Sequence, residues 1–234
     1  MFAASSVTKH CGRINTKREV KPATSPRQEF IFENGHRIGK LAQDLFPGGT
    51  EIELDLQNFD NMIEKTRQLI DQGAKVIYEA TFKSRNVLIM ADILVRNGDV
   101  WDLYEVKAST SAKPQHKPDA AIQWYVIQDH LPLGKAHIVH VNNDYVFNGE
   151  LDITQLLAIE GITDAVLELQ PGLDQNLESM SEMLSQNEPD IPIGLQCDDP
   201  YECAFKAYCW QGVPSPSVFN LYRMDKQRKF ELYH

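Results

Sequence analysis

The chain has 234 residues, of which 42% are hydrophobic and 24% charged, the composition of an ordinary globular protein. No run approaches the roughly 18 apolar residues of a membrane-spanning helix, and the first residues lack the apolar stretch of a secretory signal. We therefore expect a cytoplasmic protein with no membrane partner. The net charge of −10 is unevenly spread: residues 1–40 hold eight Lys or Arg against three Glu, whereas 136–205 hold fourteen acidic residues and no basic one. A phosphate backbone could meet the N-terminal part but not the acidic stretch.

Apolar periodicity and turn residues predict the helices and strands in chain order. Helices are expected at 28–45, 58–72, 119–130, 154–160 and 163–186, and strands at 51–54, 75–82, 86–96, 100–108 and 136–142. This order predicts a mixed α/β sheet with helices on its faces. The sequence divides into a basic N-terminal segment (1–27), a core (28–150) and an acidic helical segment with a cysteine-bearing tail that packs on the core (151–234). We expect little periodic structure after residue 186.

One strand contains an unusual carboxylate. The segment Val87–Val95 is apolar at every position except Asp92, so the strand is expected to be buried on both faces. An ionised carboxylate in that setting costs several kcal/mol unless a cation or hydrogen-bond donors meet it. Asp92 is therefore a candidate site residue.

The next strand supplies two more charged groups on the same face. Asn97–Gly98 predicts a two-residue hairpin turn, which would place Asp92 opposite Leu103. Because side chains alternate along a strand, Glu105 and Lys107 would share the face of Asp92, with Glu105 as its diagonal neighbour.

Two such carboxylates can hold one divalent ion. Mg²⁺ and Mn²⁺ prefer oxygen ligands, and such an ion polarises a phosphoryl oxygen and acidifies water. A nearby lysine can orient the attacking water or offset charge that develops on phosphate. The alternative is a hairpin with a charged outer face at its far end.

These motifs, taken in order, resemble the PD-(D/E)XK nuclease superfamily and its RecB-like branch. The resemblance is carried by Asp92, by E-V-K at 105–107, by Glu79 in VIYEATF, by DAAIQWYVIQDH and by ENGHRIGKLAQDLFPGG, and runs from about residue 28 to the end. It implies a restriction-endonuclease-like core related to the CRISPR-associated adaptation exonucleases, and DNA repair as the setting. It implies metal ligands at Asp92, Glu105, Val106 and Glu79, and catalytic roles for Asp92, Glu105, Lys107, Gln123 and Tyr125.

Several of these residues have ordinary structural alternatives. A Gln at a helix start is often solvated and a Tyr on an amphipathic helix is often part of the core, which are the alternatives for Gln123 and Tyr125. Many RecB-like exonucleases carry a metal-binding His four residues after a Gly in the first helix, but Gly39 occupies that place here. A surface or capping role is therefore expected for His36. The stretch ENGHRIGKLAQDLFPGG resembles the opening helix of a bacterial family within the RecB-like branch. That family usually continues into a second domain, so the chain is expected to be a short member or a fragment.

Four cysteines without an export signal argue against structural disulfides and leave metal binding or buried thiols. They are Cys11, Cys197, Cys203 and Cys209. One precedes the core and three follow it, which resembles the split arrangement of iron–sulfur RecB-like nucleases and implies a [4Fe–4S] cluster. Zinc and buried thiols are the alternatives.

The sequence thus predicts a metal-dependent DNA nuclease with a structural [4Fe–4S] cluster, acting on single strands or ends as an exonuclease. An endonuclease on the same fold is one alternative, and a non-catalytic nucleic-acid-binding module is another.

Overall fold

The computed structural model describes residues 24–186, 191–199 and 202–234. Cys11 and the basic residues before Thr24 lie outside the described residues. The α-helices are α2 Pro26–Gln43, α3 Phe59–Asp71, α4 Lys117–Ile127, α5 Ile153–Leu156, α6 Thr163–Leu169, α7 Leu173–Ser185, α8 Lys206–Cys209 and α9 Lys226–Tyr233. The strands are β1 Thr50–Glu51, β2 Val76–Ser84, β3 Val87–Asn97, β4 Val100–Lys107, β5 Leu133–Val141 and β6 Leu157–Gly161.

The chain divides into two compact units. The first, here called the core unit, is Ser25–Leu173, and the second, here called the tail unit, contains Asp174–His234. The core unit includes β6 and α6. Among the described residues, no helix combines the length and the apolar composition needed to cross a membrane.

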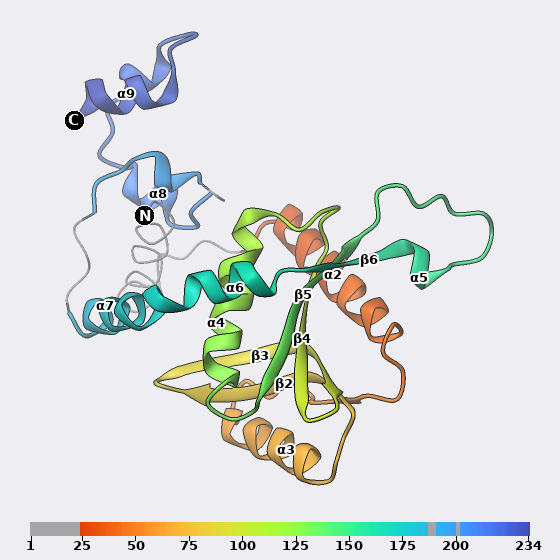
Figure 1. The fold of residues 1–234 in the computed structure, drawn as a ribbon. Coiled ribbons are helices and arrows are strands. Elements are labelled where there is room, and N and C mark those ends of the chain that lie inside the picture. Colours follow the sequence, from red (N-terminus) through yellow and green to blue (C-terminus); the bar gives the residue numbers. More distant parts are fainter. Residues whose placement is uncertain (1–23, 187–190, 200–201) are drawn as a thin grey trace. The chain divides into compact units, whose positions relative to one another are not determined.

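Six strands form one mixed sheet in the order β1-β2-β3-β4-β5-β6, with helices packed on it (Figure 1). Pairing is parallel for β1–β2 and β4–β5, and antiparallel for β2–β3, β3–β4 and β5–β6. The parallel β4–β5 pair needs a crossover, which α4 supplies. The predicted mixed α/β sheet flanked by helices is confirmed.

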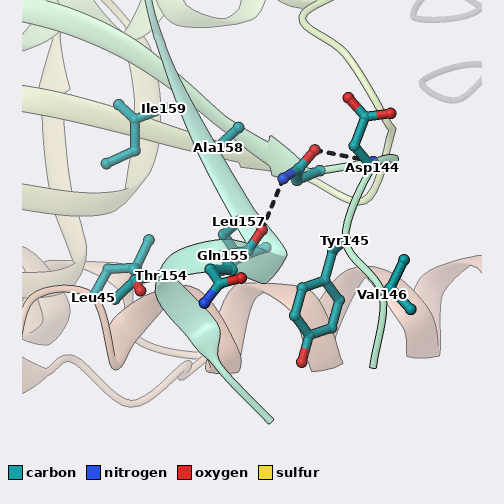
Figure 2. Close-up of a pocket in the computed structure, with 10 residues that line it drawn as sticks. Leu45, Asp144, Tyr145, Val146, Thr154, Gln155, Leu157, Ala158 and Ile159 are labelled. Carbon is teal, nitrogen blue, oxygen red and sulfur yellow. Dashed lines mark hydrogen bonds between the residues drawn. The ribbon is translucent and has the colours of Figure 1, made fainter. Parts of the chain in front are cut away.

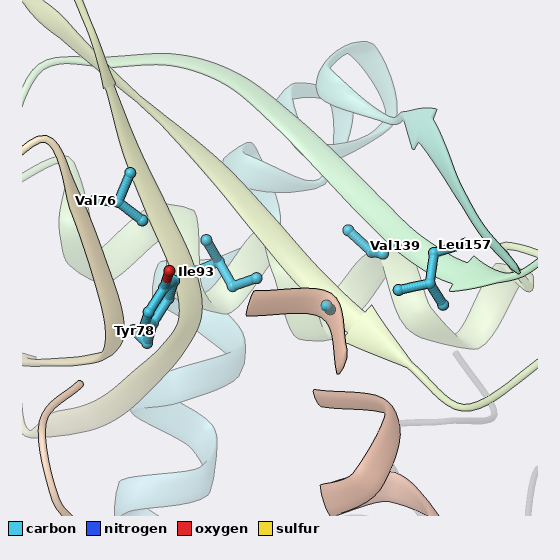
Figure 3. Close-up of a cluster of buried hydrophobic side chains, with 6 residues drawn as sticks. Val76, Tyr78, Ile93, Val139 and Leu157 are labelled. Carbon is cyan, nitrogen blue, oxygen red and sulfur yellow. The ribbon is translucent and has the colours of Figure 1, made fainter. Parts of the chain in front are cut away.

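Helix α2 covers one face of the sheet. Ala42 packs into a buried cluster with Ile93 and Tyr78, and the cluster also contains Val76, Val139 and Leu157 (Figure 3). Since side chains alternate along β3, Asp92 and Leu94 point away from Ile93, toward the opposite face. That second face lies under α4, which is buried along most of its length.

The predicted helix at 154–160 is wrong over most of its length. The helix α5 ends at Leu156, and 157–161 forms β6, paired with β5. Tertiary pairing overrides local propensity here, because β6 satisfies the backbone groups along β5 and buries Leu157, which is 4% exposed, in the core cluster.

Two further expectations also need correction. The predicted helix at 163–186 is interrupted by a 3₁₀ turn at Gln170–Gly172, because Pro171 lacks an N–H and cannot continue the ladder. The tail after residue 186 is more regular than expected. It contains α8 and α9, which pack with a hydrophobic cluster built on Ile193, Cys197 and Phe230.

Candidate active site

The β3–β4 hairpin turns one residue later than predicted. Asn97 pairs with Val100, so Gly98 and Asp99 form the turn, and the positive φ of Gly98 (65°) suits the first central position of a type II′ turn. The predicted pairing of Asp92 with Leu103 is therefore wrong, since Leu103 pairs with Leu94. The register moves by two residues, an even number, so the prediction that Asp92 and Glu105 share a face is unaffected.

The corrected register aligns three carboxylates across three strands. Continuing the β3–β4 pairing from Ile93 and Tyr104 by one residue places Asp92 opposite Glu105. On the other side of β3, the pairs that flank Asp92 place it opposite Glu79 of β2. We call Glu79, Asp92 and Glu105 the carboxylate row.

Backbone pairing is interrupted at the carboxylate row. The β2–β3 ladder skips the Glu79–Asp92 position, and the β3–β4 ladder ends one residue before Glu105. In place of a ladder bond, the backbone N–H of Val106 donates to Oδ2 of Asp92 at 2.6 Å. The Asp92 side chain thus accepts from a backbone donor of β4 at the point where the β3–β4 ladder ends.

Glu79 has a strained backbone at this position. Its φ is 55°, in the left-handed region that L-residues rarely adopt within a strand. Such a conformation costs about 1–3 kcal/mol and persists only where the surroundings enforce it. Strain of this kind is concentrated at functional sites, which adds weight to Glu79 as a site residue.

The carboxylates of the row act on one another electrostatically. Burial and the charge of Glu105 raise the pKa of Asp92 well above its usual value, although the Val106 N–H bond opposes this. Burial, Glu51 and Glu105 raise the pKa of Glu79. Glu105 itself is only 5% exposed. The row therefore concentrates negative charge where water is scarce, which favours a bound cation.

Lys107 lies beside the row and joins two elements. Its Nζ is 2.8 Å from Oε1 of Glu105 and 2.8 Å from Oδ2 of Asp119, in the first turn of α4. Burial alone would lower the pKa of Lys107, but these two carboxylates outweigh it and the pKa is raised. Lys107 is therefore a fixed ammonium group, suited to donate a hydrogen bond rather than to accept a proton.

Gln123 holds the other oxygen of Glu105. Its Nε2 donates to Oε2 of Glu105 from one helical turn beyond Asp119. The Gln123 side chain is buried, and its Oε1 has no hydrogen-bond partner among the described residues. An unsatisfied buried acceptor is costly unless a water or ligand donates to it. The structure thus brings together Glu79, Asp92, Glu105, Lys107 and Gln123.

The donor types fit a hard divalent cation. All three members of the row offer carboxylate oxygens, and Val106, which the resemblance adds as a ligand, has only its backbone carbonyl to offer. Within the described ranges, no group of three or more His, Cys, Asp or Glu side chains forms a ready-made metal cage. Mg²⁺ usually binds through one or two carboxylates and keeps several waters.

Tyr125 and His36 do not join this group. Tyr125 is 3% exposed, and the guanidinium carbon of Arg85 lies 4.5 Å from its ring centroid, at the β2–β3 turn. Two residues along a helix differ by about 200°, so Tyr125 and Gln123 point in nearly opposite directions. His36 is exposed on α2, where its charge lowers the pKa of Glu79 without outweighing burial.

Sequence reasoning missed Asp119. It precedes Gln123 by four residues, so both side chains lie on one face of α4. That spacing was the available signal. Asp119 accepts from Lys107 and is the group on α4 that fixes the direction of the ammonium.

A separate recess in the core unit lies away from this group. It has a volume of about 770 Å³ and is formed by Leu45 after the end of α2, the loop after β5, helix α5 and strand β6 (Figure 2). Its ten lining residues, all described, include none of the predicted site residues. We assign no catalytic role to it.

Three of the four predicted cluster cysteines lie in the tail unit. Cys197 is buried in the hydrophobic cluster of this unit, Cys209 packs against that cluster, and the backbone N–H of Cys203 donates to the carbonyl of Cys197 at 2.8 Å. Within the described residues, these cysteines do not form a group that could hold a metal ion. The predicted fourth ligand, Cys11, is outside the described residues.

No protein-family model matches the sequence, and no curated protein matches it. Among solved structures, the crystal structure of SSO0001 aligns over 88% of this chain and 84% of its own, with 14% identity and a TM-score of 0.35. An alkaline exonuclease from Laribacter hongkongensis aligns over 79% of this chain and 93% of its own, with 15% identity and a TM-score of 0.33. Identity and TM-score are both too low for either alignment to indicate a function.

Proposed function

We propose that this protein is a metal-dependent nuclease that hydrolyses phosphodiester bonds of DNA at the carboxylate row. The observation that carries the proposal is the alignment of Glu79, Asp92 and Glu105 across three strands where the ladder is interrupted. The sheet gives up backbone pairing and holds Glu79 in a strained conformation where the three carboxylates align beside a lysine. Binding of a cation and a phosphate accounts for these costs better than a purely structural role does.

Each residue has a distinct part in the proposed chemistry. Asp92 and Glu105 hold a Mg²⁺ or Mn²⁺ ion together with the Val106 carbonyl, and Glu79 adds negative charge nearby. The bound ion supplies Lewis acidity, which polarises the phosphate and acidifies water. Lys107 donates a hydrogen bond to the attacking water or to the phosphate, and Asp119 orients it. Gln123 fixes the rotamer of Glu105 and offers its free Oε1 to a bound water.

The proposal is tested by cleavage of linear and circular DNA, single- and double-stranded, with Mn²⁺ and with EDTA. Lys107→Ala should lower the rate by about 10²–10³-fold, the usual effect of losing one transition-state donor. Lys135→Ala, which removes an exposed lysine of β5, is the matched control and should cleave normally. Full activity in Lys107→Ala would refute the assignment.

The sequence resemblance favours cutting from ends, and the choice of substrate tests this part separately. An exonuclease degrades linear single strands and leaves circles intact. Cleavage of circular single strands identifies an endonuclease on the same sheet. Binding of every substrate without cleavage, under metal conditions in which the protein is folded, identifies the non-catalytic module.

We also propose that Cys11, Cys197, Cys203 and Cys209 hold a [4Fe–4S] cluster, supported by the confinement of three cysteines to one small unit. Protein purified without oxygen should be brown, with broad absorption near ~400 nm. Cys209→Ser should lose the cluster, while Cys11→Ser should leave it labile. A colourless preparation with stoichiometric zinc would exclude the cluster but not the nuclease, because no proposed step of the cleavage uses the cluster.

A further inference from the structure

The tail unit contains a pocket that combines positive charge with aromatic rings. Its volume is about 630 Å³, within the range of pockets that take molecules of nucleotide size. Three lysines and two aromatic residues line it, with one acidic residue and one methionine: Lys206, Lys226, Lys229, Trp210, Phe219, Asp198 and Met224. All seven belong to the tail unit.

Asp198 holds two of the lysines in place. Lys206 donates to its Oδ1 at 2.5 Å, and Lys226 donates to its Oδ2. Burial alone would raise the pKa of Asp198, but the hydrogen bonds from these lysines outweigh it and the pKa is lowered. The aspartate therefore stays ionised and acts as a bracket for the two ammonium groups.

The pocket has an excess of positive charge and spare donors. Three ammonium groups face one carboxylate, and an ammonium has three N–H donors, of which Lys226 gives one to Asp198 and Lys229 gives one to the carbonyl of Phe219. Lys206 also contacts the exposed Glu202, so Lys226 and Lys229 have the most donor capacity left for an anion.

The surrounding sequence has the same sign of charge. Residues 206–234 carry five Lys or Arg against Asp225 and Glu231, whereas the preceding stretch 136–205 has no basic residue. An anionic polymer that reaches the tail unit is therefore attracted to its last 29 residues and repelled by the acidic stretch before them.

The aromatic side chains give the pocket a second kind of recognition. The rings of Trp210 and Phe219 lie 4.6 Å apart at their centroids with a tilt of 52°, and both side chains are partly exposed. The Lys206 ammonium is 5.7 Å from the Trp210 ring. Aromatic faces beside lysines are the usual combination for bases and phosphates of a single strand, whose bases are free to stack. A duplex has its bases already stacked and cannot use the rings.

We propose that this pocket binds a phosphate and an adjacent base of single-stranded DNA. Lys226 and Lys229 contact the phosphate, and the Trp210–Phe219 pair stacks on the base. This inference rests on the proposed function, because it takes DNA as the substrate. It concerns binding of DNA by the tail unit, which can be measured without cleavage.

The experiment measures binding of the full chain to a fluorescein-labelled dT15 strand by fluorescence anisotropy, in EDTA, over a series of salt concentrations. In Lys226→Gln/Lys229→Gln the dissociation constant should rise at least tenfold at low salt. The slope of log K against log [salt] should fall by about 0.7, the value of one phosphate contact to a single strand, because both lysines contact the same phosphate. Lys65→Gln/Lys75→Gln, an equal change of charge at exposed core-unit lysines, should leave the slope unchanged.

A second comparison tests the stacking. The wild type should bind dT15 several-fold more tightly than an abasic 15-mer, and Trp210→Leu should remove that preference. Equal affinity of the wild type for dT15 and the abasic strand would overturn the base contact, and an unchanged salt slope in the lysine variant would overturn the pocket. Because EDTA prevents cleavage, loss of nuclease activity in Lys107→Ala leaves these results unaffected, so the two proposals fail separately.

Discussion

Asp92 shows how much of the site could be predicted at the scale of single residues. An aspartate in an otherwise apolar strand is costly, and that cost identified it before any geometry was known. Glu79 was found only by resemblance, because its positive φ depends on the interrupted ladder and leaves no trace in a single sequence. Asp119 was missed although its four-residue spacing from Gln123 was visible.

The first prediction concerns the cost of Asp92 to stability. Burial and Glu105 raise the pKa of Asp92, so in metal-free protein its stabilising contribution is present at low pH and is lost as pH rises through that pKa. Asp92→Asn removes the charge and keeps an acceptor for Val106. In EDTA at neutral pH the variant should therefore be more stable by about 1 kcal/mol, or roughly 2–4 °C in Tm, and should show no cleavage with Mn²⁺.

Asp102 of β4 provides the control for this substitution. It is also buried, but it accepts from the backbone N–H of Lys135 at 2.7 Å and from Asn97 at 3.2 Å, so its charge is satisfied by fixed donors. Asp102→Asn should lower Tm. A metal-free Asp92→Asn protein that melts below the wild type would contradict the account of the carboxylate row.

The second prediction concerns Asp119 as a positioning residue. Asp119→Asn removes one of the two carboxylates that raise the pKa of Lys107, so the alkaline limb of the pH–rate profile should move to lower pH. The maximal rate should fall about tenfold, with KM little changed, and Asp119→Glu should restore part of it. Asp129→Asn, which breaks a contact with Arg85 and Ser84, is the control. A reduced rate with an unshifted limb would mean that Asp119 acts only through the fold.

At the scale of elements, the hairpin explains why the site could be predicted from an incorrect register. The turn was placed one residue early, which shifts every pair by two positions. Side chains alternate with a period of two, so a shift of two positions keeps each side chain on the predicted face of the sheet but changes its cross-strand partner. The aligned row was therefore not predicted, although its shared face was.

Strand β6 was missed for a different reason. Its five residues do not alternate between apolar and polar side chains. Leu157 is buried and most of the positions after it are exposed, a pattern typical of neither a helix nor a strand. It is a strand because it pairs with the edge of β5, and that pairing cannot be seen in the local sequence. Local patterns predicted the elements that contain their own periodicity, and failed where pairing with a remote neighbour decides the structure.

The third prediction compares two glycines in different elements. Gly98 has a φ of 65° in the hairpin turn, and a Cβ there would meet no atom within 4 Å, so only the backbone conformation resists substitution. Gly98→Ala should cost about 1–2 kcal/mol. Gly35 lies inside α2, also with open space around it. Gly35→Ala should stabilise by about 0.5–1 kcal/mol. Chemical denaturation measures both, and the same sign for the two variants would contradict the turn assignment.

At the scale of the whole molecule, the order of the expected elements predicted the class of the fold. Mixed strands and helices in this order indicated an α/β sheet, and the structure has one. The division into two units after Leu173 depends on the tertiary contacts that the chain makes. Pro171 and Gly172, in the 3₁₀ turn just before it, do not by themselves indicate a boundary between units. The net charge of −10 includes a C-terminal segment that is basic. A negative total charge therefore does not by itself exclude a nucleic-acid partner, because the distribution of the charges along the chain also matters.

The most direct test of the central claim is the single-turnover rate of Mn²⁺-dependent cleavage of a linear single strand by Glu105→Gln. This substitution keeps the size of the side chain and removes the negative charge of Glu105. That carboxylate pairs with Lys107, accepts a hydrogen bond from Gln123 and acts electrostatically on Asp92. With Asp102→Asn as the control on the same strand, the account predicts a loss of at least a thousandfold for Glu105→Gln, about 4 kcal/mol of transition-state stabilisation, and a rate near wild type for the control. A Glu105→Gln protein that cleaves within a few-fold of the wild type would contradict it.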